Sequence, residues 1–225
     1  MKMRLFAALT ATLLPFTAYA ASDAPKRLEA AAEAFKEVMG IPDKSIPQDL
    51  LEKAECIVII PDLKKGAFIV GGKYGKGFVS CRKKDGVGWS APGSIRIEGG
   101  SVGFQIGGSE MDVFMLVMND RGMERLLGDK FTLGADATVA AGPVGRVAQA
   151  ETDARMTAEI LAWSRARGLF AGIALNGATM REDDDWNQAL YGKPLKNREI
   201  VSGSVAPTKS AAPLLRELDR YSSRK

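Results

Sequence analysis

The stretch that decides the fold is CIVIIPDLKKGAFIVGGKYGKGFVSC, which occupies residues 56–81. It opens with a short β-branched run at 56–60 that Pro61 closes, a pattern typical of a buried strand. Two further runs, 67–71 and 77–81, lie on either side of a glycine-rich segment. The stretch therefore predicts three consecutive strands joined by tight turns.

The same pattern continues towards the C-terminus. Short apolar runs recur every eight to twelve residues or so with glycine at the joints, which favours an antiparallel sheet or a barrel. A later hairpin is expected to turn at 165–168. The runs are 88–91, 94–98, 102–106 and 112–118, and the arms of the later hairpin are 159–164 and 169–176.

Helical patterns flank these strands. Apolar residues at helical spacing predict an N-terminal helix that begins at Asp23 and ends before Gly40, and a short helix follows at 47–53. A central helix is expected at 121–127 and an amphipathic C-terminal helix at 213–221. The chain is therefore predicted to be α+β, with a β-rich antiparallel sheet or barrel-like core and flanking N-terminal, central and C-terminal helices.

The first twenty residues have the features of an export signal. A basic start precedes an uncharged apolar stretch that is too short to span a bilayer, and Ala18-Tyr19-Ala20 has the small-x-small pattern of a cleavage site. Cleavage near Ala20 removes two basic residues and no acid, which lowers the formal net charge from +4 to +2. We expect a signal peptide at 1–20, a single domain at 21–200, a linker with a short helix at 201–225, and a periplasmic or secreted protein.

The composition restricts the chemistry. The 225 residues include two Cys and no His, which excludes Ser-His-Asp and Cys-His catalysis and any zinc site with imidazole ligands. Residues 183–187 resemble the start of a calcium loop but lack its glycine and its final Glu, so we expect no metal and no cofactor. An exported hydrolase would have to use carboxylates. Its candidates are Asp112, Asp136, Asp153 and Glu159.

Seven basic residues and no acid lie between residues 63 and 84. If the hairpin turns near Lys73, Lys64 and Lys65 lie beside 82–84 at its open end. Lys73 and Lys76 then lie at the opposite end. Five such residues would support salt-sensitive attachment to an anionic membrane, since each contributes about 1 kcal/mol. The alternative is a solvated hairpin end that aids solubility; nucleic acid is disfavoured because no recognised binding motif is present. The residues are Lys64, Lys65, Lys73, Lys76, Arg82, Lys83 and Lys84.

The two cysteines, Cys56 and Cys81, leave two interpretations open. An oxidising compartment favours a disulfide, which would stabilise the fold by about 3 kcal/mol. In a three-strand meander, however, Cys56 begins the first strand and Cys81 ends the third, which places them at opposite ends.

Several strings together resemble one family. They are KKGAF (64–68), GGKYGKG (71–77), GWSAP (88–92), GGSVGFQIG (99–107), KFTLG (130–134), AAGPVGR (140–146) and RGLFAG (167–172). In this order they are similar to the SYLF domain family, over about residues 34–192. The resemblance implies binding of phosphoinositides or other anionic lipids, no known enzymatic activity, and actin association in eukaryotic relatives.

Three hypotheses follow for the function. The first is non-enzymatic binding of an anionic phospholipid surface through the basic hairpin, with no nucleic acid and an unknown protein partner. The alternative is a periplasmic carrier that holds a small apolar ligand inside its β-rich core. The hydrolase is the third.

Overall fold

The computed structural model describes residues 23–67, 70–83, 87–102, 107–145 and 158–222, so the expected signal peptide at 1–20 lies outside the described residues. Within them the strands form a nine-stranded sheet in the order β5-β9-β3-β2-β1-β4-β7-β6, with β8 paired to β7. The strands are β1 (Cys56–Ala67), β2 (Val70–Cys81), β3 (Gly93–Val102), β4 (Gly107–Val117), β5 (Lys130–Thr132), β6 (Val139–Ala141), β7 (Ile160–Ala166), β8 (Leu169–Gly172) and β9 (Thr179–Glu182).

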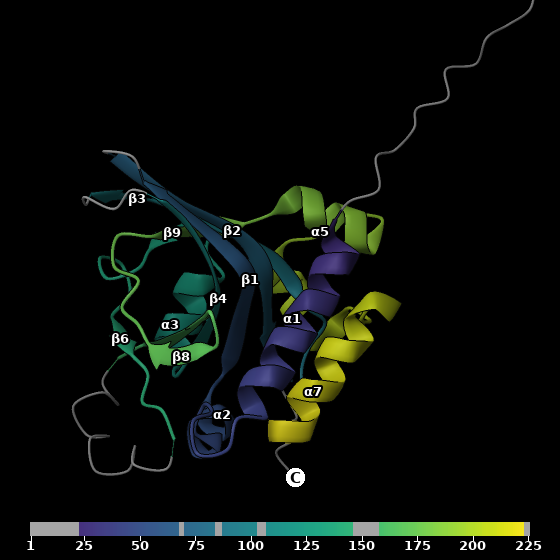
Figure 1. Ribbon diagram of the computed structural model, residues 1–225. Helices are drawn as coiled ribbons and strands as arrows, with labels where there is room; N and C mark the ends of the chain where they lie inside the picture. The colour runs from purple at the N-terminus through teal and green to yellow at the C-terminus, as the bar shows by residue number, and fades with distance from the viewer. Residues whose placement is uncertain (1–22, 68–69, 84–86, 103–106, 146–157, 223–225) are drawn as a thin grey trace, which may run out of the picture.

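Helices cover one face of this curled sheet and lie at its ends (Figure 1). The predicted α+β class, with a sheet core and flanking helices, is confirmed. Neighbouring strands are antiparallel except β6 and β7, which are parallel. The helices are α1 (Ala24–Met39), α2 (Gln48–Lys53), α3 (Asp120–Leu126), α5 (Asp184–Tyr191), α6 (Asn197–Glu199), η2 (Ile200–Ser204), η3 (Lys209–Ala211) and α7 (Ala212–Ser222).

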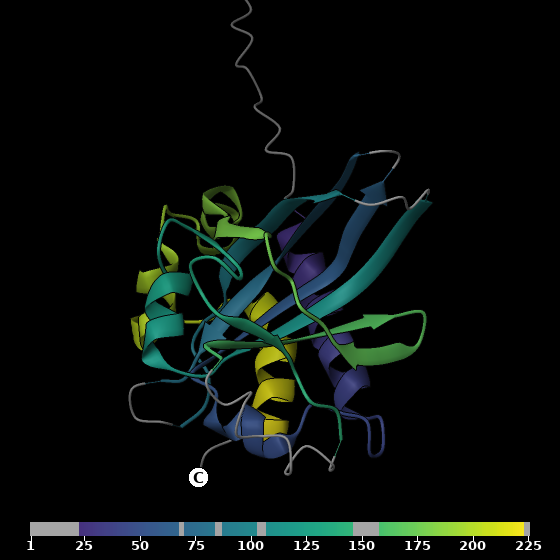
Figure 2. The ribbon, with the colours of Figure 1, turned by 90° about the vertical axis from the view of Figure 1, so that its left-hand side faces the viewer.

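Both faces of the central strands are buried, which explains why residues 56–60 are apolar at every position. Ile57 and Ile59 join the core beneath the helices, where α1 contributes Phe35 and α7 contributes Leu218. The alternate positions of the run join a second core on the concave side, which α3 and the short strands cover (Figure 2). The sheet is therefore the middle layer of the molecule.

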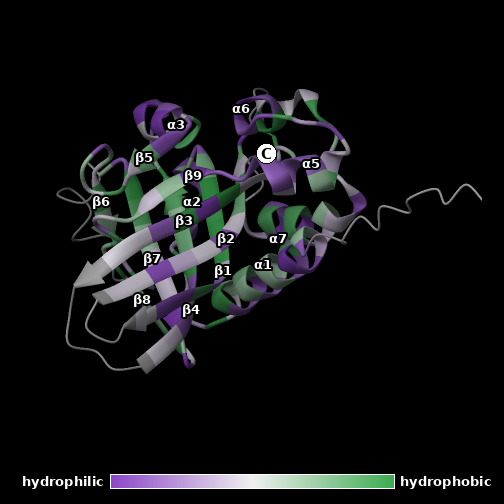
Figure 3. Ribbon diagram, turned by 90° about the horizontal axis from the view of Figure 1, so that it is seen from above, coloured by the Kyte–Doolittle hydropathy of each residue, from purple (hydrophilic) through white to green (hydrophobic). Residues whose placement is uncertain are grey.

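The hydrophobic character of the long strands is confined to one half of their length. Figure 3 shows green strand segments near the helices and pale or purple segments towards the ends drawn at lower left. β1 to β4 run beyond α1 at this end, which we call the distal end (Figure 1). We call the opposite end, where β1 begins and β2 finishes, the base.

The three strands expected in residues 56–81 are two long strands in the structure. β1 and β2 form one hairpin whose turn lies between Ala67 and Val70, not near Lys73. The glycine-rich segment is strand because β1 bulges towards it: a Cβ on Gly77 would lie 2.1 Å from the carbonyl oxygen of Ile59. Here glycine permits close approach of two backbones and does not mark a turn.

This change of topology places the two cysteines together. Cys56 and Cys81 are paired across β1 and β2 at the base, and they form a disulfide with a Cα–Cα distance of 3.9 Å. The expected separation at opposite ends is wrong because it assumed an extra strand between them.

Other expectations differ less from the structure. The run at 88–91 is a loop with a single bridge between Arg82 and Trp89, and 112–117 is the second half of the longer β4, which ends one residue before the expected strand does. The hairpin at 159–176 is confirmed, with its turn at Arg167 and Gly168. The helices expected at the N-terminus, the centre and the C-terminus are also present. No helix in the described part of the chain has the length and apolar character needed to cross a bilayer.

Candidate functional site

The structure separates the seven basic residues of the hairpin, and Arg82 lies at the base. Its side chain is 8% exposed and stacks on Trp89, with 3.9 Å between the guanidinium carbon and the ring centre. It donates hydrogen bonds to the carbonyl oxygens of Leu51 (3.0 Å), Ala54 and Ser222. Arg82 thus joins β2 to the C-terminal ends of α2 and α7, and it cannot face a ligand.

Lys76 also has a structural role. Its ammonium lies 2.7 Å from a carboxylate oxygen of Asp183, whose side chain is 1% exposed, and 4.5 Å from the ring centre of Trp186. Burial of Asp183 requires this partner, since an uncompensated buried charge is strongly destabilising. The contact anchors α5 to the face of β2.

The expected basic rim is not formed. Lys83 is exposed at the base, and Lys84 lies outside the described residues. Lys64 and Lys65 are at the other end of the hairpin, because the turn lies between Ala67 and Val70. The residues that the structure does bring together are therefore the lysines of the distal end.

Lys65 and Lys73 face each other directly across β1 and β2. Like charges in this position are destabilising. The pKa of Lys73 is lowered from its ordinary value of 10.5, mainly by burial and further by the positive charge of Lys65. Lys73 extends across Gly99, where a Cβ would lie 3.2 Å from its Cε. An anion between the two ammonium groups would relieve this repulsion.

A surface pocket of about 620 Å³ lies beside this pair, at the edge of β4. It forms there because β7 pairs with β4 only from Asp112 onwards, so that among the described residues no strand pairs with the distal part of β4 on that side. The tight β7–β8 turn, with positive φ at Arg167 and Gly168, brings an additional cation to the pocket. The lining residues are Lys64, Lys65, Gly66, Gly108, Ser109, Glu110 and Arg167.

The floor of this pocket is bare backbone. Gly66 pairs with Gly72 on one side and with Gly108 on the other, and Gly72 pairs with Gly100, so four glycines cross four strands in one row. A Cβ added at any of the four would meet no atom within 4 Å. A ligand can therefore approach the main chain closely here.

Two exposed apolar side chains accompany the cations. Leu169, which follows the β7–β8 turn, is 77% exposed, and Tyr74, opposite Lys64, is 48% exposed. Sequence reasoning missed Arg167, Leu169, Ser109 and Glu110 as members of this site. The Arg-Gly turn was visible in the sequence, but its position beside β1 depends on where β7 leaves β4.

The carboxylates considered for a hydrolase have structural partners. Asp112 accepts hydrogen bonds from the Asp62 amide (3.0 Å) and from Arg165 (2.6 and 2.8 Å), and burial is the main cause that raises its pKa. The other two described carboxylates bind backbone amides: Asp136 accepts from Thr132 at 2.7 Å and Glu159 from Thr138 at 3.0 Å. Asp153 lies outside the described residues.

The calcium-like stretch is occupied by helix capping. Asp183 accepts a hydrogen bond from the amide of Trp186 and caps α5. Within the described ranges, no group of three or more acidic or Cys side chains is placed to hold a metal ion. The concave interior that a carrier would need is filled by buried side chains, among them Ile97, Met115, Phe131 and Met180.

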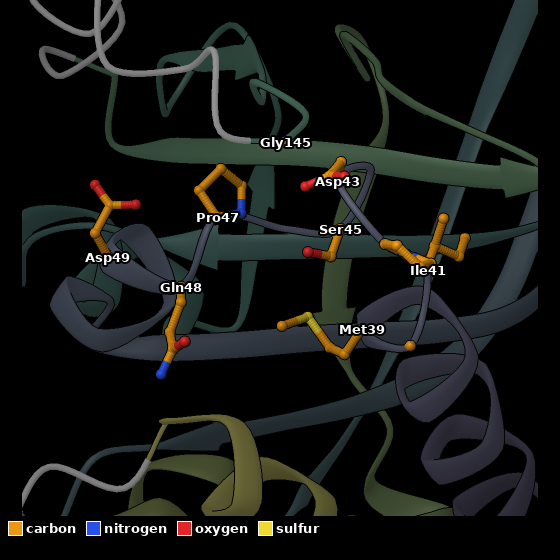
Figure 4. A pocket seen from close by; sticks show the side chains of 10 residues that line it. Met39, Ile41, Asp43, Ser45, Pro47, Gln48, Asp49 and Gly145 are labelled. Atoms are coloured by element: carbon orange, nitrogen blue, oxygen red, sulfur yellow. The ribbon is translucent and has the colours of Figure 1, made fainter.

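A second surface pocket, of about 510 Å³, lies at the opposite end of the molecule, between the end of α1 and α2 (Figure 4). Its side chains include Met39, Ser45 and Pro47 together with the carboxylates of Asp43 and Asp49. No basic side chain is among its described lining residues, so its charge is the reverse of that at the distal end.

Comparison with known proteins identifies the family. A family model named Ysc84 and described as "Las17-binding protein actin regulator" matches residues 98–221, more than half of the chain. SH3 domain-containing YSC84-like protein 1 of Bos taurus is 34% identical over 184 residues, which is 81% of this chain and 53% of that protein.

Two fungal relatives show a similar level of identity. LAS seventeen-binding protein 3 of Saccharomyces cerevisiae is 35% identical over 181 residues, 79% of this chain and 39% of that protein. SH3 domain-containing protein PJ696.02 of Schizosaccharomyces pombe is 36% identical over 178 residues, 77% of this chain and 41% of that protein. The chain thus spans about half the length of these relatives, or less. It belongs to the Ysc84 family of binding, actin-associated domains, which confirms its resemblance to the SYLF family.

Proposed function

We propose that this protein is exported and binds anionic phospholipid membranes, without catalysis, through the distal end of its sheet. The observation that supports the proposal is the in-register pair of Lys65 and Lys73, with Lys64 and Arg167 beside it. A membrane phosphate would neutralise charges that repel one another in the unbound protein. The family resemblance to lipid-binding domains points in the same direction.

The surroundings of these cations suit a membrane surface. Leu169 and Tyr74 are exposed at the same end, and an apolar side chain beside cations can enter the headgroup region while the cations meet phosphates. The glycine row adds no side chain that would hold a flat surface away. Among the described residues, the helices on this face cover the half of the strands near the base, and the strands extend beyond them at the distal end (Figure 1).

The test is co-sedimentation with phosphatidylcholine vesicles that contain or lack phosphatidylglycerol. We expect binding only to the anionic vesicles, with an affinity that falls as salt is added. The triple variant Lys64→Glu, Lys65→Glu, Lys73→Glu should weaken binding roughly a hundredfold or more, since each cation contributes about 1 kcal/mol.

A matched control separates this site from net charge. Lys53→Glu, Lys193→Glu and Lys209→Glu change three exposed lysines on other elements, and this triple variant should retain most of the binding. Equal losses in the two triple variants, or no loss in the first, would overturn the proposal. Arg82 is unsuitable for such a test because its replacement would disturb the fold.

A further inference from the structure

We propose that the pocket at the distal end of β4 recognises a phosphoethanolamine headgroup, with the phosphate at Lys64 and Arg167 and the ammonium at Glu110. The inference rests on the proposed function and names the headgroup that the same site selects. It arises from Glu110, the acid among the described lining residues of the pocket. A site that binds only anions does not explain the presence of this carboxylate.

Glu110 is well placed to bind a ligand. It is paired with Lys64 across β1 and β4, and their charged atoms are 3.7 Å apart. Both side chains are largely exposed, at 63% for Glu110 and 69% for Lys64, so this ion pair contributes little to stability. The carboxylate can exchange its lysine for a ligand ammonium at small cost.

A carboxylate beside these cations weakens the binding of a simple anion, because it repels the same charge that the cations attract. The arrangement becomes favourable when the ligand carries both charges. The phosphate then meets Lys64 and Arg167, the ammonium meets Glu110, and Lys64 is released from Glu110 to join the phosphate.

The spacing of the two strands fits such a ligand. Lys64 on β1 and Glu110 on the adjacent β4 are paired on the same face, and their charged atoms are 3.7 Å apart. The two-carbon link of phosphoethanolamine places its charges at a comparable separation. Gly66 and Gly108 are the next pair on the same face of these two strands, and they let the link approach the main chain closely.

The chemistry of the ammonium gives selectivity. A primary ammonium donates up to three hydrogen bonds, and a carboxylate accepts them in a charge-assisted contact. The quaternary ammonium of phosphocholine has no N–H to donate. The pocket should therefore prefer ethanolamine to choline, even though the two headgroups carry the same net charge.

Phosphoethanolamine can come from a bilayer or from a soluble molecule. The position of the pocket favours a bilayer, because Leu169 and Tyr74 are exposed at the same end and would meet acyl or headgroup regions together with it. The expected ligand is therefore membrane phosphatidylethanolamine, bound alongside the anionic lipid that attracts the other cations.

The experiment compares vesicles with a constant fraction of phosphatidylglycerol, the remainder being either phosphatidylethanolamine or phosphatidylcholine. The native chain should bind the ethanolamine vesicles about two- to fivefold more tightly, the effect of one exposed ion pair. Glu110→Gln should abolish this preference and retain binding to both vesicles. Glu124→Gln, which changes an exposed acid on α3, should keep the preference.

The outcomes distinguish the two proposals. Absence of binding to any phosphatidylglycerol vesicle would contradict the proposed function itself. Equal binding to the two vesicle types, or a preference that survives in Glu110→Gln, would overturn the headgroup inference alone.

Soluble competitors test the source of the ligand. Glycerophosphoethanolamine should displace the native chain from ethanolamine vesicles better than glycerophosphocholine or inorganic phosphate do. Equal competition by all three would overturn the recognition of the ammonium. Tight binding of glycerophosphoethanolamine together with a failure to bind vesicles would overturn the membrane source.

Discussion

The two ends of the β1–β2 hairpin carry the same kinds of residue in opposite states. At the base, Arg82 is buried against Trp89 and hydrogen-bonded to two helix ends, next to the Cys56–Cys81 disulfide. At the distal end, Lys65 and Lys73 are opposed to each other on strands that extend beyond the helices. One end uses its cation to hold the fold together, whereas the other keeps two like charges opposed to each other, which we propose meet a ligand.

The difference shows that a run of basic residues is not by itself a binding surface. The covering elements decide the role of each cation: α2 and α7 enclose Arg82, and α5 provides Asp183 for Lys76. The lysines beyond the reach of these helices are the ones that we propose meet a ligand. Changes at the base should therefore alter stability, and changes at the distal end should alter binding.

The largest expected effect is that of Arg82→Ala at the base. The change leaves three carbonyl oxygens without their donor and removes the stack on Trp89, so we expect a loss of about 3 kcal/mol or more in the free energy of unfolding. Urea denaturation measures the loss. Lys65→Ala, which removes a cation at the distal end, should cost no stability, and a similar loss in both variants would contradict the comparison.

The disulfide gives the next largest effect. Replacement of Cys56 and Cys81 by Ala removes a cross-link between residues 25 positions apart, which should lower the free energy of unfolding by about 3 kcal/mol. The folded double variant should still bind anionic vesicles as the native chain does, because the cross-link lies at the base. Loss of vesicle binding by the folded variant would show that the two ends are not independent.

Much of the fold could be predicted from local patterns. The apolar run at 56–60, the N-terminal helical spacing and the Arg167-Gly168 turn each indicated their element correctly, because each depends on neighbours in the sequence. The number of strands in 56–81 could not be predicted, since glycine occurs both in turns and where two backbones approach closely. Only the bulge of β1 against Gly77 distinguishes the two.

The site was harder to predict than the fold. The lysine-rich character of the hairpin was evident, but a wrong turn position placed Lys64 and Lys65 beside Arg82, at the end opposite to their true one. Glu110 and Arg167 come from strands far along the chain, and their approach to β1 depends on the register of β4 and on the departure of β7. Such contacts between distant segments have no local sequence signal.

The smallest expected effect is a change in the free energy of unfolding caused by a substitution at the distal end. Lys73→Thr removes a cation that faces Lys65 and puts a residue with high strand propensity in its place, so the free energy of unfolding should rise by about 0.5 kcal/mol while binding to anionic vesicles falls. Lys64→Thr is the matched control. Lys64 faces Tyr74 and Glu110, so its replacement should weaken vesicle binding without stabilising the fold.

The pH dependence of the Lys73→Thr effect identifies its cause. Because burial and Lys65 lower the pKa of Lys73 from 10.5 in the folded state, the unfolded chain binds more protons between the two pKa values, and the stability of the native chain rises with pH in that range. The part of the Lys73→Thr advantage that comes from the lysine charge should therefore be full at neutral pH, shrink as the pH rises between the two pKa values, and be lost above 10.5. An advantage that stays constant across this range would mean that strand propensity causes it, and not the burial of the Lys73 charge and its repulsion by Lys65.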